Sequence, residues 1–300
     1  MKWNTTRFVL DLTSPKVMGI VNVTPDSFSD GGQHASTAAA LQHCEILIRD
    51  GADILDIGGE SSRPGALRLT LEEELERVLP VVREAVGLGV PISVDTCKPK
   101  VMQAVLDLGV DIVNDIWALR WTASDAGISQ PNAMQVVSRH TGCGVCLMHM
   151  HREPRSMQIV PMVGDVVLQV KQFLESRART LEAQGVNRAR IVIDPGIGFG
   201  KTAAQNFTLL GRQGELLVGG YPLLVGWSRK SSLAELTGVA PGAHEALKAQ
   251  QRLVPSVAAA LLAVERGAAI VRVHDVRETV QAIRVRNAIE SSSGVKSTCV

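Results

Sequence analysis

The residues best suited to chemistry stand directly after short apolar runs of the sequence. Eight such runs are each followed by polar side chains at a similar register, which packing alone does not explain. We therefore interpret these side chains as parts of one ligand site. In chain order they are Asn22, Glu60, Ser61, Ser62, Arg63, Asp95, Asn114, Asp115, His149, Asp194, Ser228, Arg229, Lys230, Arg272 and His274.

These side chains form two chemical sets. Asp95, Asn114 and Asp194 offer hydrogen-bond acceptors and one amide donor, which suits a flat heterocycle with adjacent N–H groups. The second set offers donors and positive charge, which suit phosphate oxygens. Its members are Ser61, Ser62, Arg63, Lys230, Arg272 and His274. Asn22 adds a neutral oxygen of the kind that contacts magnesium held mainly by a substrate's phosphates.

No side chain has the surroundings of a catalytic nucleophile. Ser228 lacks the flanking pattern of a nucleophile elbow, and Cys97 has no evident base partner. This favours a transfer in which the site positions two substrates and stabilises a departing pyrophosphate.

The segment 191–202, IVIDPGIGFGKT, is a buried-strand pattern that runs into a glycine-rich turn. Pro195 stands where a P-loop needs glycine, and Lys201 stands where a dinucleotide-binding loop needs its third glycine. Both nucleotide interpretations therefore fit poorly. An aspartate at the tip of an apolar run, followed by glycines that let backbone approach a ligand, still indicates a ligand site.

Two short patterns admit a metal or redox interpretation. Cys143 and Cys146 match C-x-x-C with His140 before them, and His149 and His151 resemble a metal-binding pair at a strand end. Cys146 lies inside the apolar run VCLM, which favours a small buried residue, and the histidine pair lacks a matching set of further ligands. Five irregularly spaced cysteines fit reduced thiols better than a disulfide framework.

Length and composition limit the class of protein. Three hundred residues suit a single α/β barrel. A net charge of +1 argues against binding to nucleic acid or acidic membranes, and 3% aromatic residues argue against a base-stacking surface. The first twenty residues lack a signal-peptide core, and the apolar run 257–264 is too short to span a membrane. We expect a cytoplasmic protein.

Strands and helices alternate along the whole chain. The strand-like apolar runs are 17–23, 54–59, 91–96, 111–116, 144–150, 191–196, 222–228 and 269–275. Helical patterns follow from about Ser36, at a capping box that begins at Thr70, after Pro99, and near 132–140, 164–184, 203–214, 245–265 and 276–290.

This alternation predicts a single α/β domain, a (β/α)8 barrel with long loops after the first and second strands. A doubly wound open sheet is the alternative, because the sequence does not show closure. We expect residues 1–16 to be an N-terminal leader, 17–290 the barrel and 291–300 a disordered tail. In such barrels the site lies at the carboxyl ends of the strands.

Several sequence blocks resemble one family. The chain is similar to the dihydropteroate synthases of folate biosynthesis over roughly residues 17 to 285. The blocks are MGIVNVTPDSFSDGG (18–32), DIGGESSRPGA (56–66), SVDTCKP (93–99), VNDI (113–116), LMHM (147–150), DPGIGFGKT (194–202), GWSRKS (226–231) and RVHDV (272–276). The resemblance implies a TIM barrel, usually a homodimer. It implies that 6-hydroxymethyl-7,8-dihydropterin pyrophosphate and p-aminobenzoate are condensed with magnesium, by dissociative substitution.

The resemblance also implies roles for residues that match the family's motifs. The pterin would be held by Asp95, Asn114, Asp194 and Lys230, the pyrophosphate by Ser62, Arg63, Arg272 and His274, and magnesium by Asn22. Pro64, Phe199 and Ser231 would line the p-aminobenzoate pocket, where sulfonamides compete. Arg63, Lys230, Arg272 and His274 would act in catalysis. Phe28 and Asp30 would belong to a mobile first loop that closes over the site.

The chain departs from the family at two places. Ser62 stands where the family usually has Thr, and His151-Arg152 stand where it usually has Gln-Gly; we expect the latter pair to face solvent. One alternative function is therefore a catalytically inactive pterin-binding homologue. Another is a pterin-dependent methyltransferase barrel, although Lys230 and the Arg272–His274 pair speak against it because a methyl donor needs no pyrophosphate clamp.

Overall fold

The structure is a computed structural model that describes residues 1–23, 32–60, 68–121, 132–152, 161–234, 236 and 251–293. Eight parallel strands form one sheet in the order β8-β7-β6-β5-β4-β3-β10-β9. They are β3 (Lys16–Asn22), β4 (Ile54–Gly58), β5 (Ile92–Asp95), β6 (Ile112–Asp115), β7 (Gly144–Met148), β8 (Ile191–Asp194), β9 (Leu224–Val225) and β10 (Ile270–Val273).

The two ends of this sheet meet. Ile193 of β8 and Leu223, just before β9, form a parallel bridge, and Ile193 N donates to Pro222 O at 3.0 Å. The sheet is therefore a barrel. The predicted (β/α)8 barrel is confirmed, and the doubly wound open sheet is excluded.

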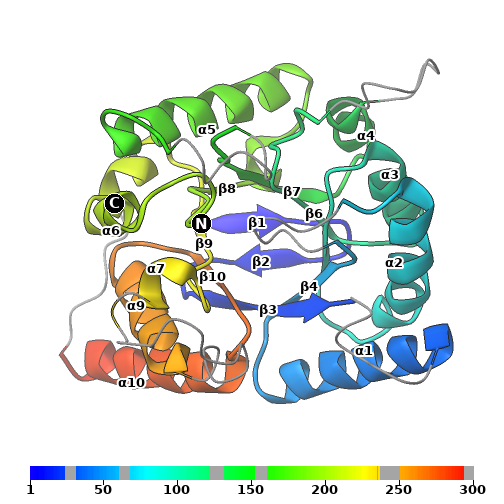
Figure 1. The fold of residues 1–300 in the computed structure, drawn as a ribbon, viewed down its shortest axis with the longest axis horizontal. Helices are drawn as coiled ribbons and strands as arrows, with labels where there is room; N and C mark the ends of the chain where they lie inside the picture. The colour runs from blue at the N-terminus through cyan, green and yellow to red at the C-terminus, as the bar shows by residue number, and fades with distance from the viewer. Residues whose placement is uncertain are drawn as a thin grey trace.

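The helices surround the strands as an outer ring (Figure 1). They are α1 (Gly32–Arg49), α2 (Leu71–Ala85), α3 (Pro99–Asp107), α4 (Ala133–Arg139), α5 (Val166–Ala183), α6 (Ala203–Gly211), α7 (Ser231–Ala234), α9 (Leu253–Glu265) and α10 (Val276–Ser293), with the 3-10 helices η2 (Arg188–Arg190) and η3 (Gln213–Gly219). No helix in the described ranges has the length and apolarity needed to cross a membrane.

Local sequence signals explain where several helices begin. Thr70 and Glu73 form the predicted capping box of α2, with Glu73 N donating to Thr70 Oγ1 at 3.1 Å and Thr70 N donating to Glu73 Oε2 at 2.7 Å. Pro99 is at the start of α3, where its missing N–H costs nothing. Helix α10 continues to Ser293, into the segment that we expected to be a disordered tail.

The inside of the barrel is layered. An apolar layer takes one side chain from each of seven strands: Met18, Ile54, Ile112, Cys146, Val192, Leu224 and Ile270. Side chains alternate along a strand, so a residue two positions further along faces the same interior. Four such positions, closer to the carboxyl ends, carry polar side chains: Asp56, Asn114, Asp194 and Arg272. The alternation that builds the core thus also directs polar residues into the barrel mouth.

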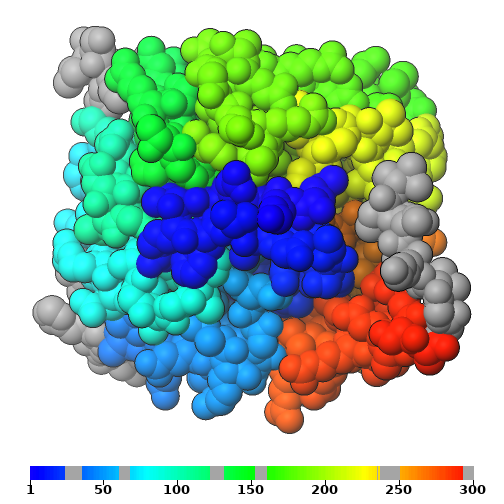
Figure 2. All heavy atoms as spheres, turned by 180° about the vertical axis from the view of Figure 1, so that it is seen from behind, coloured from blue at the N-terminus to red at the C-terminus, as the bar shows by residue number. Residues whose placement is uncertain are grey.

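The opposite end of the barrel is covered by an N-terminal hairpin. Strands β1 (Lys2–Asn4) and β2 (Val9–Asp11) pair antiparallel, with Trp3 opposite Leu10. Trp3 is fully buried in the barrel interior, and its Nε1 donates to the carbonyl oxygen of Arg190 at 2.9 Å. Figure 2 shows the N-terminal residues lying across the middle of this face. Residues 1–16, expected only as a leader, therefore include a structural element of the barrel.

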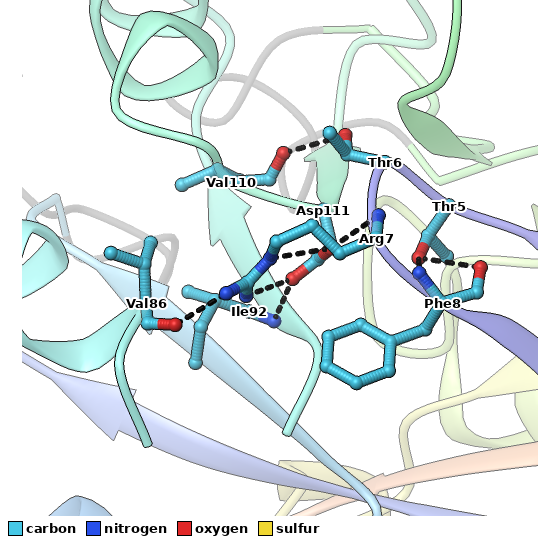
Figure 3. A network of polar contacts seen from close by, with 8 residues as sticks. All are labelled: Thr5, Thr6, Arg7, Phe8, Val86, Ile92, Val110 and Asp111. Carbon is cyan, nitrogen blue, oxygen red and sulfur yellow. Dashed lines mark hydrogen bonds and ion pairs between the residues drawn. The ribbon is translucent and has the colours of Figure 1, made fainter. Parts of the chain in front are cut away.

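An ion pair between the exposed Arg7 and the buried Asp111 fixes this hairpin to the strands (Figure 3). The fully buried carboxylate of Asp111 accepts hydrogen bonds from Arg7 N at 3.0 Å, Arg7 Nη2 at 2.5 Å and Ile92 N at 2.9 Å. Thr6 Oγ1 donates to the carbonyl oxygen of Val110 at 2.8 Å. The hairpin is thus bonded to the residues just before β6, and Asp111 in turn bonds to the start of β5.

Candidate active site

Arg272, in β10, lies between two carboxylates from β4 and β5. Its Nε donates to Oδ2 of Asp56 at 2.6 Å, and its Nη2 donates to Oδ2 of Asp95 at 3.1 Å. Burial alone would lower the pKa of Arg272, but the carboxylates of Asp56 and Asp95 more than offset this and raise it. The guanidinium therefore stays charged at the barrel mouth.

Asn114 and Arg272 share a partner that sequence reasoning missed. Nδ2 of Asn114 donates to Oδ2 of Asp56 at 3.1 Å, so Asp56 joins a residue of the acceptor set to one of the cation set. Burial raises the pKa of Asp95, and the Arg272 guanidinium opposes this effect. The signal for Asp56 was a carboxylate inside the apolar run 54–59, because a buried carboxylate requires a partner.

Asp194 ends β8 and holds the start of the glycine-rich turn. Its Oδ1 accepts from Gly196 N at 2.7 Å. Burial raises the pKa of Asp194 to about 6, and the Gly196 hydrogen bond and the Lys230 charge oppose the rise. Burial and the Arg272 charge lower the pKa of Lys230 to about 8, which Asp194 and Asp95 partly offset. Asp194, Lys230, Arg272 and Asp95 therefore act on one another electrostatically.

Phe199 and Lys230 meet across the glycine-rich turn. The Nζ of Lys230 lies 4.3 Å from the centroid of the Phe199 ring, a cation–π distance. Gly198 has a φ of +82°, and a Cβ there would stand 3.2 Å from Cδ of Lys230. The positive φ therefore favours glycine at this position, and the missing side chain leaves room for the lysine stem. This brings the DPGIGFGKT and GWSRKS blocks together.

Lys201 fixes the conformation of the same turn. Its Nζ is buried and donates to the carbonyl oxygens of Gly196 at 2.8 Å, Phe199 at 3.2 Å and His149 at 3.3 Å. Burial lowers the pKa of Lys201 to about 7, and Asp194 opposes the shift. Lys201 is therefore a residue that holds the turn from behind, which the sequence pattern did not reveal.

Asn206, in α6, connects the turn to the Ser-Arg-Lys block. Its Oδ1 accepts from Gly198 N at 3.0 Å, and its Nδ2 donates to Ser232 Oγ at 2.8 Å. Asn206 is fully buried, so both bonds lie in the interior. Ser231, expected at the p-aminobenzoate pocket, is the exposed first residue of α7, next to Ser232.

His274 and Ser228 are brought together from the segments that follow β10 and β9. Ser228 Oγ lies 2.9 Å from His274 Nδ1 and accepts from His274 N at 3.1 Å. Arg229 adopts a left-handed φ of 57° and pairs with Asp275 at 2.6 Å. Ser228 thus serves to orient the imidazole, consistent with its not being a nucleophile.

Two strand-end carboxylates have structural partners. Glu60 Oε2 lies 2.5 Å from Nζ of Lys98, which also pairs with Glu74. Asp115 accepts from Trp117 N at 2.8 Å and Leu119 N at 2.7 Å, and burial raises its pKa to about 6. Both are explained by packing of the surrounding turns, so they do not join the acceptor set.

The cysteines and histidines of the metal and redox patterns have structural roles. Cys146 is a fully buried residue of the barrel interior, as expected, and Cys143 Sγ lies 3.2 Å from Nη2 of Arg190. Burial lowers the pKa of His149 to about 2, and its ring packs edge-on against Phe173. Among the residues that the structure describes, no three His, Cys, Asp or Glu are grouped to hold a metal ion.

The surroundings of Cys97, His151 and Arg152 bear on their expected roles. Burial raises the pKa of the Cys97 thiol well above its ordinary value, which makes a thiolate nucleophile unfavourable. Arg152 is exposed, as expected, whereas His151 is half-buried and its N–H donates to the carbonyl oxygen of Phe199 at 3.4 Å. Arg152 therefore faces solvent, and His151 is only partly exposed.

Asn22 is the candidate magnesium ligand. It ends β3 as an exposed side chain, paired in register with Gly58, which in turn pairs with Asp95. Magnesium usually takes few ligands from the protein and the rest from phosphates and water. One neutral amide oxygen therefore suits a magnesium ion that is held mainly by a ligand's phosphates. Six residues with expected roles lie outside the described residues: Phe28, Asp30, Ser61, Ser62, Arg63 and Pro64.

Comparisons with known proteins agree with this arrangement. A family model described as "Pterin binding enzyme" matches residues 18–274. The dihydropteroate synthase of Neisseria meningitidis serogroup C is 49% identical over 290 residues, which are 96% of this chain and 97% of that protein.

Two solved structures match over nearly their full length. The Burkholderia cenocepacia dihydropteroate synthase complexed with 7,8-dihydropteroate has a TM-score of 0.84 and 44% identity, with 98% of each chain covered. The Yersinia pestis dihydropteroate synthase with a sulfonamide drug complex has a TM-score of 0.85 and 41% identity, covering 97% of this chain and 100% of that one. Sequence blocks, barrel and strand-end residues lead to one conclusion: the chain belongs to the dihydropteroate synthase family of pterin-binding enzymes.

Proposed function

We propose that the strand-end residues of this chain carry out the reaction of its family in the following roles. The reaction joins 6-hydroxymethyl-7,8-dihydropterin pyrophosphate to p-aminobenzoate, giving 7,8-dihydropteroate and pyrophosphate, and makes the chain a transferase. The observation that carries the proposal is the contact of Arg272 with Asp95, because it joins the cation set to the acceptor set at one barrel mouth.

Asp95, Asn114 and Asp194 accept hydrogen bonds from the N–H groups of the pterin ring. Two observations support this role. The three side chains point into the barrel, and all three are buried or nearly so. Lys230 donates to the ring's acceptor atoms, with Asp194 and Asp95 close enough to influence its pKa. A flat ring held by fixed donors and acceptors on one edge is oriented as well as bound.

Arg272 and His274 bind the pyrophosphate, together with Ser62 and Arg63. Arg272 is the best-supported of these, because its charge is secured by two carboxylates. Guanidinium groups bind phosphate oxygens through parallel N–H bonds and stabilise the charge that develops on a leaving pyrophosphate. His274 follows directly after the end of β10, two residues beyond Arg272, and Ser228 holds its imidazole.

Phe199, Ser231 and Pro64 line the p-aminobenzoate pocket. Phe199 supports this role through its ring, which lies beside the ammonium of Lys230. The aromatic amine is thereby brought close to the pterin carbon that it attacks.

The chemistry is a dissociative substitution. The bond between the exocyclic carbon and the pyrophosphate oxygen breaks, and its electron pair leaves with pyrophosphate, toward Arg272 and His274. The pterin ring stabilises the resulting cation, the neutral amine attacks it, and the amine then loses a proton to water. No general base of high pKa is required.

Magnesium is proposed as the cofactor, with Asn22 as its protein ligand. Bound by pyrophosphate, it neutralises phosphate charge. Its binding to the protein is tested by comparing Asn22→Ala with the unaltered chain in titrations with magnesium and pyrophosphate together.

A homodimer is proposed from the family resemblance. Exposed apolar side chains on two adjacent helices support it: Val254 and Leu262 on α9, and Val285 and Ile289 on α10. Sedimentation would show a monomer for Val285→Glu if this face is the interface. The cytoplasmic location remains a prediction, which cell fractionation tests.

A pyrophosphate-release assay tests the function. Dihydropterin pyrophosphate, p-aminobenzoate and magnesium are supplied together, and each is omitted in turn. Release that depends on all three, with dihydropteroate as product, supports the proposal. Binding of the pterin pyrophosphate without release would instead support the inactive homologue.

A further inference from the structure

Asp56 is fully buried in β4 and holds side chains from three other strands. Ser93 Oγ donates to its Oδ1 at 2.6 Å, while Asn114 Nδ2 and Arg272 Nε donate to its Oδ2 at 3.1 and 2.6 Å. We propose that Asp56 is a positioning residue that orients the pterin-binding amide of Asn114 and the pyrophosphate-binding guanidinium of Arg272 together. This inference rests on the proposed function, because it assigns Asp56 to the two ends of one substrate.

Asp56 orients the amide of Asn114. An ionised carboxylate only accepts hydrogen bonds, so the group that Asn114 turns toward Asp56 is its NH2. A flipped amide would place its oxygen against the oxygens of Asp56. Asp56 therefore directs Oδ1 of Asn114 away from itself, as an acceptor. Without this bond the amide would present a donor or an acceptor to the pterin with no preference.

The guanidinium of Arg272 is the second group that Asp56 orients. It has five N–H groups, of which one on Nε bonds to Asp56 and one on Nη2 bonds to Asp95. The bond at Nε fixes the plane and the direction of the group. The remaining N–H groups can donate hydrogen bonds to the oxygens of pyrophosphate.

The two carboxylates on Arg272 have different surroundings. The Asp56 side chain is 0% exposed and is held by two further donors, whereas the Asp95 side chain is 12% exposed. Asp95 is also the one with a proposed pterin contact. Asp56 is thus the permanent partner of Arg272, and Asp95 the partner that exchanges Arg272 for the pterin when substrate binds.

A comparison within the chain separates positioning from mere stabilisation. Asp111 is equally buried and equally paired with an arginine, Arg7, but lies at the opposite end of the barrel. None of its partners is a proposed ligand contact. Asp111→Asn is therefore the matched control for Asp56→Asn: both remove one buried charge from an arginine pair.

The test measures two ligands separately by titration calorimetry on the full chain: 6-hydroxymethylpterin, which lacks phosphates, and inorganic pyrophosphate. Asp56→Asn is expected to weaken both at least tenfold, and Asp111→Asn to change neither by more than about twofold. Wild-type affinity of folded Asp56→Asn for either ligand would overturn the inference. Failure of the wild-type chain to bind the pterin would overturn the proposed function instead.

Double mutants distinguish positioning by Asp56 from a purely structural role. The effect of Asp56→Asn on pterin binding should vanish when Asn114 is already alanine, and its effect on pyrophosphate binding should vanish when Arg272 is already alanine. Effects that persist in both backgrounds would contradict positioning. If Asp56→Asn does not fold, Ser93→Ala loosens the same carboxylate and should weaken both ligands about threefold; unchanged affinities would overturn the proposal.

Discussion

The Nζ of Lys230 lies 4.3 Å from the centroid of the Phe199 ring. The contact joins a proposed pterin residue to a proposed p-aminobenzoate residue. The face of an aromatic ring carries partial negative charge, so it favours the protonated lysine. The two pockets are therefore coupled through the charge of Lys230.

Phe199→Leu should shift the alkaline limit of pterin binding. Because the pKa of Lys230 is lowered to about 8, its charge is lost as the pH rises through about 8, and pterin affinity should fall there. Loss of the ring removes about 0.5–1 kcal/mol from the charged form, which moves this limit down by roughly 0.4–0.7 pH units. Pterin titrations from pH 7 to 9.5 measure it. Phe207→Leu, beside Trp227, is the control, and an unmoved limit in Phe199→Leu would refute the coupling.

Asp194→Asn should mainly weaken pterin binding. A hydrogen bond to a charged acceptor contributes about 1.5–3 kcal/mol, which corresponds to roughly 10–100-fold in Kd. The asparagine oxygen can still accept from Gly196 N, so the turn should persist. Calorimetry with the pterin measures the loss, and the exposed Asp107→Asn is the control. An unaltered pterin affinity would contradict the assignment.

The carboxylate of Asp194 should also set the lower pH limit of pterin binding. Its pKa is raised to about 6, so the charged acceptor is present above that pH and is lost as the pH falls through it. Pterin affinity of the wild-type chain should therefore decline below about pH 6. Asp194→Asn should lack this decline, and its persistence there would assign the limit to another group.

Arg272→Ala should lower turnover by about 10²–10³-fold, the usual scale for loss of a charge-stabilising donor. It should also destabilise the fold by about 3–5 kcal/mol, because it leaves the carboxylate of Asp56 buried without its cation. Turnover is measured with saturating substrates and stability by urea unfolding. The exposed Arg277→Ala is the control, and unchanged turnover would remove Arg272 from catalysis.

Gly196→Ala should be severely destabilising. Gly196 has a φ of +66°, and a Cβ there would lie 1.9 Å from the carbonyl oxygen of His149. We expect a loss of about 4 kcal/mol or more in the free energy of unfolding. Gly185→Ala separates the backbone strain from the steric clash. Gly185 has a φ of +87°, but a Cβ there would meet no atom within 4 Å. Its loss should be only about 1 kcal/mol, and equal losses would show that the clash is relieved.

Much of the barrel could be predicted because its strands are buried on both faces and appear as continuous apolar runs. Closure depends on Ile193 meeting Leu223, which no local pattern encodes. The hairpin was missed because β1 and β2 are short and mixed in polarity, and only the complete barrel gives Trp3 a place to be buried.

The strand ends were predictable because parallel strands carry their carboxyl ends to one edge. What the sequence could not show is which side chains meet. The bond between Arg272 and Asp56 joins positions 216 residues apart, and Lys201 was considered only as a mismatch to a nucleotide motif. Its three carbonyl partners follow from the turn's conformation, which a pattern of residue types does not specify.

The N-terminal hairpin has a consequence for how the chain is made. Trp3 bonds to the carbonyl oxygen of Arg190, which lies 187 residues later. At 5–20 residues per second, a ribosome needs roughly 10–40 s to reach that partner, during which Trp3 lacks its native burial site. This part of the barrel's cover is therefore synthesised well before its partner and can dock in its native place only afterwards. A nascent chain must keep this tryptophan from other contacts until β8 has formed.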